Sequence, residues 1–436
     1  MNVAGKRRQG ATAVLASMLA VALVAAAILG VIGYRGIRRY TAGKDVTRTF
    51  QVLPATPTGL WIMRAPDGTL GGLYVVVARP NQDGGHVVSI PTYASPAEAT
   101  APDSFADVYA RDGEEALVLT VESALRLSFD TVLVSSPGDV ASRLEALVPL
   151  TVDLPNDVTS AADGGEVTLQ QGEHDLTADE LAAVLASPGR GTNASRAGNV
   201  AAVLDSLAAT VSARVAATPP ATSGTTPDSA VTTPPAPPVT DMASLLARVL
   251  RGPLDSKVLG TATSSVAAAV TEGTAVEDAV GDASTETTLD PAAEPLTFEI
   301  VDIAAALLVF GSIAPANMST PSPGLNYSLT APLGAESRVM DAIALILYLG
   351  GNVTRVQLTN APPRAETVVY IYAERDRDRL ATSNPLFGKV EFGKAETPIE
   401  GIDVLVELGK GFLDLTPQRP DPQSVPGTSA STDPGE

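Results

Sequence analysis

The residue types that most often carry out chemistry are scarce in this chain of 436 residues. It has no cysteine, which excludes disulfides, thiolate zinc sites and thiol nucleophiles. Its two histidines, His86 and His174, are too few for a His-rich metal site, and a Ser-His-Asp triad would have to use one of them. Both lie in polar, turn-like segments, so we expect solvated side chains rather than catalytic ones.

The remaining candidates for a functional site are two arginines and the uncharged residues that follow one strand. Residues 89–91 (Ser-Ile-Pro) end a strand, a good place to present charged groups, yet the uncharged Thr92 and Tyr93 follow. Arg190 lies in a Gly-Arg-Gly loop without the Lys and Ser/Thr of a phosphate-binding loop, which argues against nucleotide binding. Arg196 lies near the start of an expected helix, where the alternative to ligand binding is a solvated side chain.

The overall charge limits the partners. The net charge is -20 and the isoelectric point is about 4.5. Such an acidic surface repels phosphate backbones, so we expect no binding to nucleic acid.

The amino-terminal segment predicts a membrane anchor. Basic residues at positions 6–8 precede residues 11–32, an apolar run without a charge that is long enough to cross a bilayer. A cleavable signal would have a shorter apolar region. We expect a cytoplasmic segment at 1–10, a transmembrane helix at 11–32 and a basic stalk at 33–50. Because basic residues flank both sides, orientation rests on the acidic remainder and its Pro/Thr-rich spacer, which favour a single-pass cell-membrane protein with its bulk extracytoplasmic.

Residues 51–319 alternate strand-like and helix-like runs, which predicts an α/β domain with a sheet and flanking helices. Thr177 and Glu180 have capping-box spacing at the start of a helix. The Pro/Thr-rich residues 218–239 read as an extended insertion. The apolar run 303–313 is too short to cross a membrane and is expected to be a core element. Strands are expected at 73–78, 87–90, 131–135 and 150–155, and helices at 114–127, 141–148, 177–186, 198–211 and 242–250.

A second, smaller α/β domain is expected at 325–415. Residues 337–351 have an amphipathic helical pattern that stops at Gly350 and Gly351. Strands are expected at 326–331, 353–360, 367–373, 390–392 and 403–409. The Pro/Ser/Asp-rich residues 416–436 are expected to form a disordered tail.

The order of these motifs resembles the LytR-CpsA-Psr (LCP) family of bacterial envelope phosphotransferases. The resemblance rests on the anchor, the strand ending VVSIP, the segment DSFADVYARDGEEALVLTVESALRLSFD and the strand PLTVDLP. Residues 325–413 resemble the LytR C-terminal domain through ETVVYIYA and DVLVELGKGF. Arginine is far commoner than lysine, and Ala, Val and Gly are abundant. This composition fits a bacterial source.

The resemblance implies transfer of a glycopolymer from a polyprenyl-pyrophosphate carrier to peptidoglycan. It also implies arginines that bind the pyrophosphate and acidic residues that hold Mg²⁺. Forked guanidinium groups and a divalent cation neutralise charge on the leaving group.

The chain departs from that pattern at most charged positions. Thr92-Tyr93 stand where the family has Arg-Asp. Gly71-Gly72 stand where it has an acid, directly before the strand expected at 73–78. An arginine of the family falls near Ala186-Ser187. Within residues 195–200 only Arg196 keeps its arginine; Asn199 and Val200 replace the second arginine and a glutamine. Arg190 is a displaced substitute.

Losing several charge-assisted phosphate contacts, each worth about 1.5–3 kcal/mol, predicts a non-catalytic protein with neither catalytic nor metal-binding residues. Arg196 and Arg190 remain as ligand-binding candidates for envelope glycan or a polyprenyl-linked precursor, and an LCP enzyme is a possible partner. The alternative is an active phosphotransferase with a rebuilt site and Mg²⁺. A third hypothesis, a transcriptional regulator, conflicts with the acidic surface and the anchor.

Overall fold

The structure is a computed structural model, and it describes residues 50–96, 103–162, 165–186, 192–217, 239–266, 296–372, 380, 387–395 and 397–415. The expected cytoplasmic segment, transmembrane helix and stalk up to residue 49 lie outside the described residues. So do residues 218–238 of the insertion, the tail at 416–436 and Arg190.

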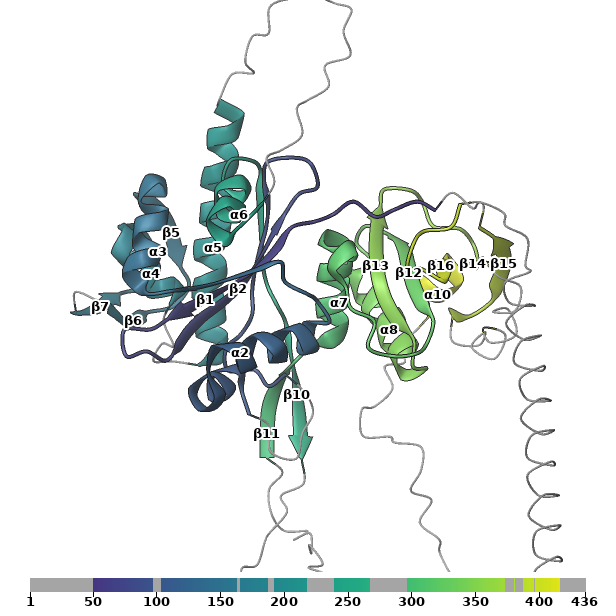
Figure 1. Cartoon of the computed structure of the whole chain (residues 1–436), viewed down its shortest axis with the longest axis horizontal. Coiled ribbons are helices and arrows are strands. Elements are labelled where there is room, and N and C mark those ends of the chain that lie inside the picture. The colour runs from purple at the N-terminus through teal and green to yellow at the C-terminus, as the bar shows by residue number, and fades with distance from the viewer. Residues whose placement is uncertain are drawn as a thin grey trace, which may run out of the picture. The chain divides into compact units, whose positions relative to one another are not determined.

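A mixed five-stranded sheet forms the centre of the first part of the chain, in the order β4-β1-β2-β3-β9 (Figure 1). Its antiparallel pairs are β1–β2 and β2–β3, and its parallel pairs are β1–β4 and β3–β9. The strands are β1 (Thr58–Arg64), β2 (Leu70–Ala78), β3 (Gly85–Ser89), β4 (Thr131–Ser135) and β9 (Leu254–Val258). The expected α/β class with a mixed sheet is confirmed.

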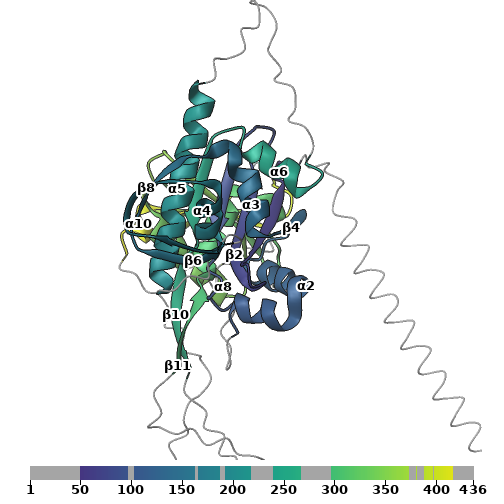
Figure 2. The ribbon, with the colours of Figure 1, turned by 90° about the vertical axis from the view of Figure 1, so that its left-hand side faces the viewer.

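Helices cover both faces of this sheet. Every residue of β2 is buried, as expected for a strand whose side chains pack against helices on either side. Tyr74 and Val76 pack with α3 to α6, while Leu73 and Val75 pack with α2 and α7. Figure 2 shows α3, α4 and α6 above β2 and α2 below it. The helices are α2 (Phe105–Leu125), α3 (Pro137–Leu144), α4 (Ala178–Leu185), α5 (Asn193–Ala217), α6 (Met242–Val249) and α7 (Ile303–Ile313).

Three short two-stranded sheets accompany the main one. They pair β5 with β8, β6 with β7, and β10 with β11. Their bounds are β5 (Leu150–Leu154), β6 (Val158–Ala162), β7 (Gly165–Leu169), β8 (Gly172–Leu176), β10 (Thr261–Val266) and β11 (Leu296–Val301). Of these, only β5 was predicted. β6, β7, β8 and β10 are rich in polar or small residues, and the alternating apolar pattern of β11 was missed.

The expected helices are confirmed, with shifted ends. Thr177 caps α4 in the predicted capping box with Glu180. The helix predicted at 114–127 begins earlier, at Phe105, and contains a kink at Gly113, whose φ of 82° is left-handed. The helix predicted at 141–148 begins at Pro137, behind a Ser136 cap, and ends in a short 3₁₀ turn, η1 (Glu145–Leu147).

A second five-stranded sheet follows, in the order β13-β12-β16-β14-β15. Helix α7, predicted as a core element, packs Phe310 into the first core and Leu307 into that of the second sheet. Gly350, with φ 75°, ends α8 as expected. A 3₁₀ turn, η2 (Pro315–Asn317), precedes β12 (Asn326–Pro332), α8 (Glu336–Tyr348), β13 (Asn352–Thr359), β14 (Thr367–Ile371), β15 (Val390–Lys394), β16 (Val404–Glu407) and α10 (Lys410–Leu413).

Among the described residues, one helix, α5, is long and apolar enough to cross a membrane. Its Val203, Leu204 and Leu207 are buried in the core with the first sheet. We therefore interpret α5 as a core helix.

The prediction that both histidines lie in turns is wrong. His86 belongs to β3 and His174 to β8, because strand pairing extends through these polar residues. The His86 side chain is only 25% exposed, 3.4 Å from Asp255. His174 is partly exposed, and its Nε2 lies 2.6 Å from the Gln170 carbonyl oxygen.

Candidate functional site

The substituted positions lie together in space. A small cavity of about 40 Å³, here called the Arg196 cleft, is bounded by the end of β3, the start of β2, the end of α4 and the first turns of α5. Its lining includes Gly71, Gly72, Thr92, Tyr93, Leu185, Arg196 and Val200. The folded chain thus brings together residues that are more than 100 positions apart.

Gly71 and Gly72 leave no room for a side chain. A Cβ added to Gly71 would lie 2.1 Å from the Ala186 carbonyl oxygen, and one added to Gly72 would lie 2.5 Å from that of Leu185. These are backbone atoms at the end of α4, so the clash cannot be relieved by a side-chain rotation. The place where the LCP resemblance implies an acid is filled by main chain.

Arg196 stacks on Tyr93. The guanidinium carbon lies 5.3 Å from the centre of the Tyr93 ring, within the range of a cation–π contact. Its Nη2 donates to the Asn193 side-chain oxygen at 2.6 Å, and the Tyr93 hydroxyl donates to the Asn193 carbonyl at 3.4 Å. The Arg196 Nε is buried without a hydrogen-bond partner in the described part of the chain.

Partial burial changes the ionisation of both members of this pair. It lowers the pKa of Arg196, and the interaction with Tyr93 opposes this shift. Burial also raises the pKa of Tyr93, as does the nearby Glu299, whereas Arg196 lowers it. Tyr93 therefore stays a neutral phenol, and the cleft has the single positive charge of Arg196.

Two other substituted positions have structural contacts. Asn199 is buried, and its side-chain oxygen accepts a hydrogen bond from the Asn156 backbone N–H at 3.1 Å. Ala186 is buried at the end of α4, where its N–H donates to the Ala182 carbonyl. Neither residue offers a charge to an anion.

The residues of the Arg196 cleft do not fit Mg²⁺. Magnesium in proteins is usually bound through one or two carboxylates, and the lining residues supply none. Among the described residues no group of three or more His, Cys, Asp or Glu side chains could hold a metal ion. We therefore derive no step through a metal.

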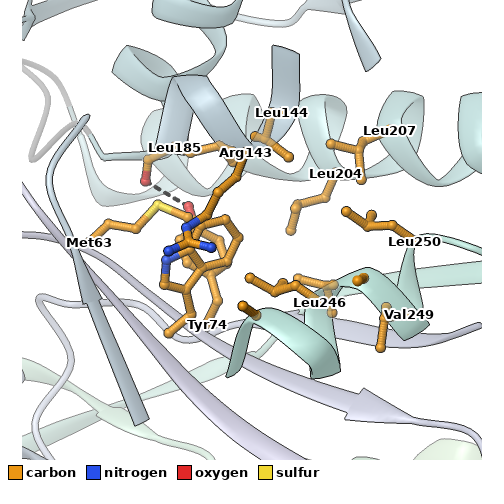
Figure 3. Close-up of a pocket in the computed structure, with 14 residues that line it drawn as sticks. Met63, Tyr74, Arg143, Leu144, Leu185, Leu204, Leu207, Leu246, Val249 and Leu250 are labelled. Carbon is orange, nitrogen blue, oxygen red and sulfur yellow. Dashed lines mark hydrogen bonds between the residues drawn. The ribbon is translucent and has the colours of Figure 1, made fainter. Parts of the chain in front are cut away.

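A larger apolar cavity, here called the Trp61 cavity, lies between the sheet and helices α3 to α6 (Figure 3). Its volume is about 170 Å³. Its walls are formed by Trp61, Met63, Tyr74, Val87, Arg143, Leu144, Leu185, Leu204, Leu207, Ala243, Leu246, Ala247, Val249 and Leu250. Sequence reasoning did not find it, since its residues come from seven separate elements and each looks like an ordinary core position.

Tyr74 separates the two cavities, because it and Leu185 line both. Its hydroxyl donates to the Leu185 carbonyl at 2.7 Å and also bonds the Ser89 side chain. This bond satisfies a carbonyl at the end of α4 that has no partner within its own helix. Complete burial raises the pKa of Tyr74, so the hydroxyl keeps its proton as a donor.

No protein-family model matches this chain, and no curated protein matches it in sequence. Solved structures do match. The similarity is to LytR-CpsA-Psr proteins. One is an LCP enzyme from Actinomyces oris, at 17% identity over 49% of this chain and 88% of that one, with a TM-score of 0.30.

Two further matches differ in what their names state. The family protein YwtF (TagT), solved with bound octaprenyl pyrophosphate lipid, is 19% identical over 50% of this chain and 84% of its own, with a TM-score of 0.29. A putative transcription regulator from Eubacterium siraeum is 13% identical over 37% of this chain and 66% of its own, with a TM-score of 0.28. At such identities and scores, the function of this chain has to be argued from its own residues.

Proposed function

We propose that this chain is a membrane-anchored protein of the bacterial cell envelope, with an LCP-like core that binds a ligand without transferring phosphate. The ligand that best suits the Arg196 cleft is the anionic end of a lipid-linked glycan precursor. The observation that carries the proposal is the closed position at Gly71 and Gly72, where main-chain oxygens occupy the place of the implied acid.

The remaining charge supports binding rather than catalysis. Transfer from a pyrophosphate requires several groups to stabilise charge that develops on the leaving phosphate. The Arg196 cleft offers one guanidinium and neutral Thr92 and Tyr93 beside it. One charge-assisted contact can hold an anion, but it supplies only a small part of the stabilisation that phosphoryl transfer needs.

The membrane anchor at 11–32 and an extracytoplasmic location belong to this proposal, and they rest on the sequence pattern. Arg190, six residues before Arg196 in the sequence and outside the described residues, is proposed as a second contact. An LCP-family enzyme that uses the same precursor is a possible partner. The two proteins would then bind the same lipid-linked precursor, and one could pass it to the other.

One observation favours the alternative, an active phosphotransferase that attaches glycopolymers to peptidoglycan. Arg196 keeps its place in the cleft, and its buried Nε has no partner among the described residues, so an anion could be its missing acceptor. In that case Mg²⁺ would have to be held by groups other than the residues that line the cleft.

The deciding experiment measures binding and turnover on the full-length protein in detergent micelles. Farnesyl pyrophosphate serves as the binding probe, with farnesol as its uncharged counterpart. Arg196→Ala should weaken binding of the pyrophosphate by about 10- to 100-fold and leave farnesol unchanged. Arg251→Ala is the matched control, because Arg251 pairs with Asp83 at the surface away from the cleft.

Turnover is measured with a polyprenyl-pyrophosphate glycan donor, a peptidoglycan acceptor and Mg²⁺. We expect none. Turnover that disappears in Arg196→Ala would overturn the proposal in favour of the phosphotransferase, whereas equal binding of pyrophosphate by both variants would remove Arg196 from the site.

A further inference from the structure

The second sheet has two unlike faces. Val369 and Val404 belong to a core to which α7, α8 and α10 all contribute. Because side chains alternate along a strand, Tyr370 and its cross-strand partner Leu405 point to the opposite face. The partly or fully exposed side chains of that face, here called the outer face, include Thr330, Arg355, Gln357, Tyr370, Leu405 and Glu407.

The Tyr370 ring lies across a glycine of the neighbouring strand. Gly393 on β15 pairs with Tyr370, and a Cβ added there would lie 2.7 Å from Cδ1 and 2.8 Å from Cε1 of the ring. The missing side chain at position 393 therefore lets the ring rest on the sheet. Because the ring is also partly exposed, it offers solvent an aromatic surface that is held in place.

Polar side chains accompany this ring. The Tyr370 hydroxyl donates to Glu407 at 3.4 Å, and the Arg364 Nε donates to the same carboxylate oxygen at 3.0 Å. The side chains of Arg364 and Glu407 are 60% and 39% exposed. On β13, the Arg355 Nη2 donates to the Gln357 side-chain oxygen at 3.1 Å. Two strands separate β13 from β14, so the two polar groups lie about 14 Å apart across the sheet.

These features suit a sugar chain. The C–H face of a sugar ring packs on the negative face of an aromatic ring, and its hydroxyl groups can bond guanidinium and carboxylate groups beside it. Arg355 and Arg364 are accompanied by Glu391 and Glu407 on this face, which therefore does not concentrate positive charge. Nucleobases also stack on aromatic side chains of open sheets, but the net charge of -20 disfavours a phosphate backbone.

We propose that the outer face of the second sheet binds an uncharged glycan chain. One sugar ring stacks on Tyr370, with its hydroxyl groups bonded to Glu407 and Arg364, and the chain runs across the strands toward Arg355 and Gln357. This site is separate from the Arg196 cleft and does not depend on the function proposed for that cleft.

The test titrates the full-length protein by calorimetry, in micelles of a detergent that has no sugar head group. The probes are two neutral tetrasaccharides, the β-linked chitotetraose and the α-linked maltotetraose, and a single-stranded oligothymidylate of ten nucleotides. We expect saturable binding of at least one tetrasaccharide and none of the oligothymidylate. Saturation-transfer NMR should show the strongest transfer at the C–H protons of one sugar ring, as stacking on an aromatic side chain requires.

Substitutions separate glycan binding from a purely structural role of the ring. Tyr370→Leu still covers Gly393 but removes the aromatic surface, and it should weaken tetrasaccharide binding about 3- to 10-fold. Tyr370→Phe keeps the ring and should bind within about threefold of wild type. Arg364→Gln should weaken binding about fivefold. Arg251→Gln is its matched control, because Arg251 forms a similarly exposed pair with Asp83 and should bind normally.

Three results would each overturn the proposal. They are no saturable binding of either tetrasaccharide, tighter binding of the oligothymidylate, and wild-type affinity in Arg364→Gln together with Tyr370→Leu. Arg364 is exposed, so its variant tests the face even if Tyr370→Leu does not fold. Arg196→Ala should leave tetrasaccharide binding unchanged, so either proposal can fail while the other stands.

Discussion

The Arg196 cleft and the Trp61 cavity share Tyr74 as a wall, yet one is about 40 Å³ with one charge and the other is about 170 Å³ and almost entirely apolar. An apolar wall contributes to folding whether or not a ligand is bound, because its side chains belong to the core. A cluster of arginines without its anion repels itself and gains nothing from the fold. The two cavities therefore differ in kind: the apolar one is part of the core, whereas the Arg196 cleft has one cation beside the uncharged Gly71, Gly72 and Thr92.

Adding an acid at Gly71, where the LCP resemblance implies one, is the strongest way to challenge this comparison. Gly71→Asp should destabilise the protein by about 3 kcal/mol, because its Cβ meets a backbone oxygen at the end of α4. Urea unfolding measures the loss. Gly260→Asp is the control, since a Cβ there meets no atom within 4 Å. A Gly71→Asp protein as stable as this control would show that the cleft can open to accept an acid.

The shared wall can be weakened by removing a single oxygen atom. Tyr74→Phe leaves the Leu185 carbonyl buried without its donor, which should reduce the free energy of unfolding by about 1–2 kcal/mol. The ring remains, so the two cavities stay separate. Thermal unfolding gives the loss, and a change below about 0.3 kcal/mol would mean that water replaces the hydroxyl and that the wall is open to solvent.

Arg196 should matter more for binding than for stability. Arg196→Ala removes the cation–π contact with Tyr93, worth about 0.5–1 kcal/mol. Comparison of its urea midpoint with that of Arg251→Ala corrects for the loss of a surface charge. A loss of several kcal/mol would instead identify Arg196 as a structural residue of α5.

The smallest expected effect concerns the pH dependence of stability through His86 on β3, which pairs with the edge strand β9. Burial lowers the pKa of His86, and Arg79 and Lys257 lower it further, while Asp255 opposes them. As the pH falls, His86 is therefore protonated in the unfolded chain first, near pH 6.5. Stability is therefore complete above about pH 6.5 and declines as the pH falls toward the folded pKa. Unfolding midpoints of wild type and His86→Gln between pH 5 and 7.5 measure this, and parallel curves would contradict it.

Parts of the fold could be predicted because their signals are local. The apolar run of β2, the capping box of Thr177 and Glu180, and the glycine that ends α8 depend on neighbours within a few residues. The strands β6 and β7 and the placement of His86 within β3 could not, since pairing with a distant partner overrides weak local preference. The kink at Gly113 follows from a left-handed φ that the sequence allows but does not require.

The sequence by itself determined that positions 71, 72, 92 and 93 carry no charge, that position 196 carries an arginine, that the pattern is mixed α/β and that cysteine is absent. The tertiary structure alone decided that these positions meet in one cleft, that the end of α4 fills the space beside the glycines, and that Tyr74 divides this cleft from an apolar cavity with Arg143 at its rim. The reason is physical. The residue at each position is a property of the sequence, whereas the shape of a cavity depends on the close packing of elements that lie far apart in the sequence.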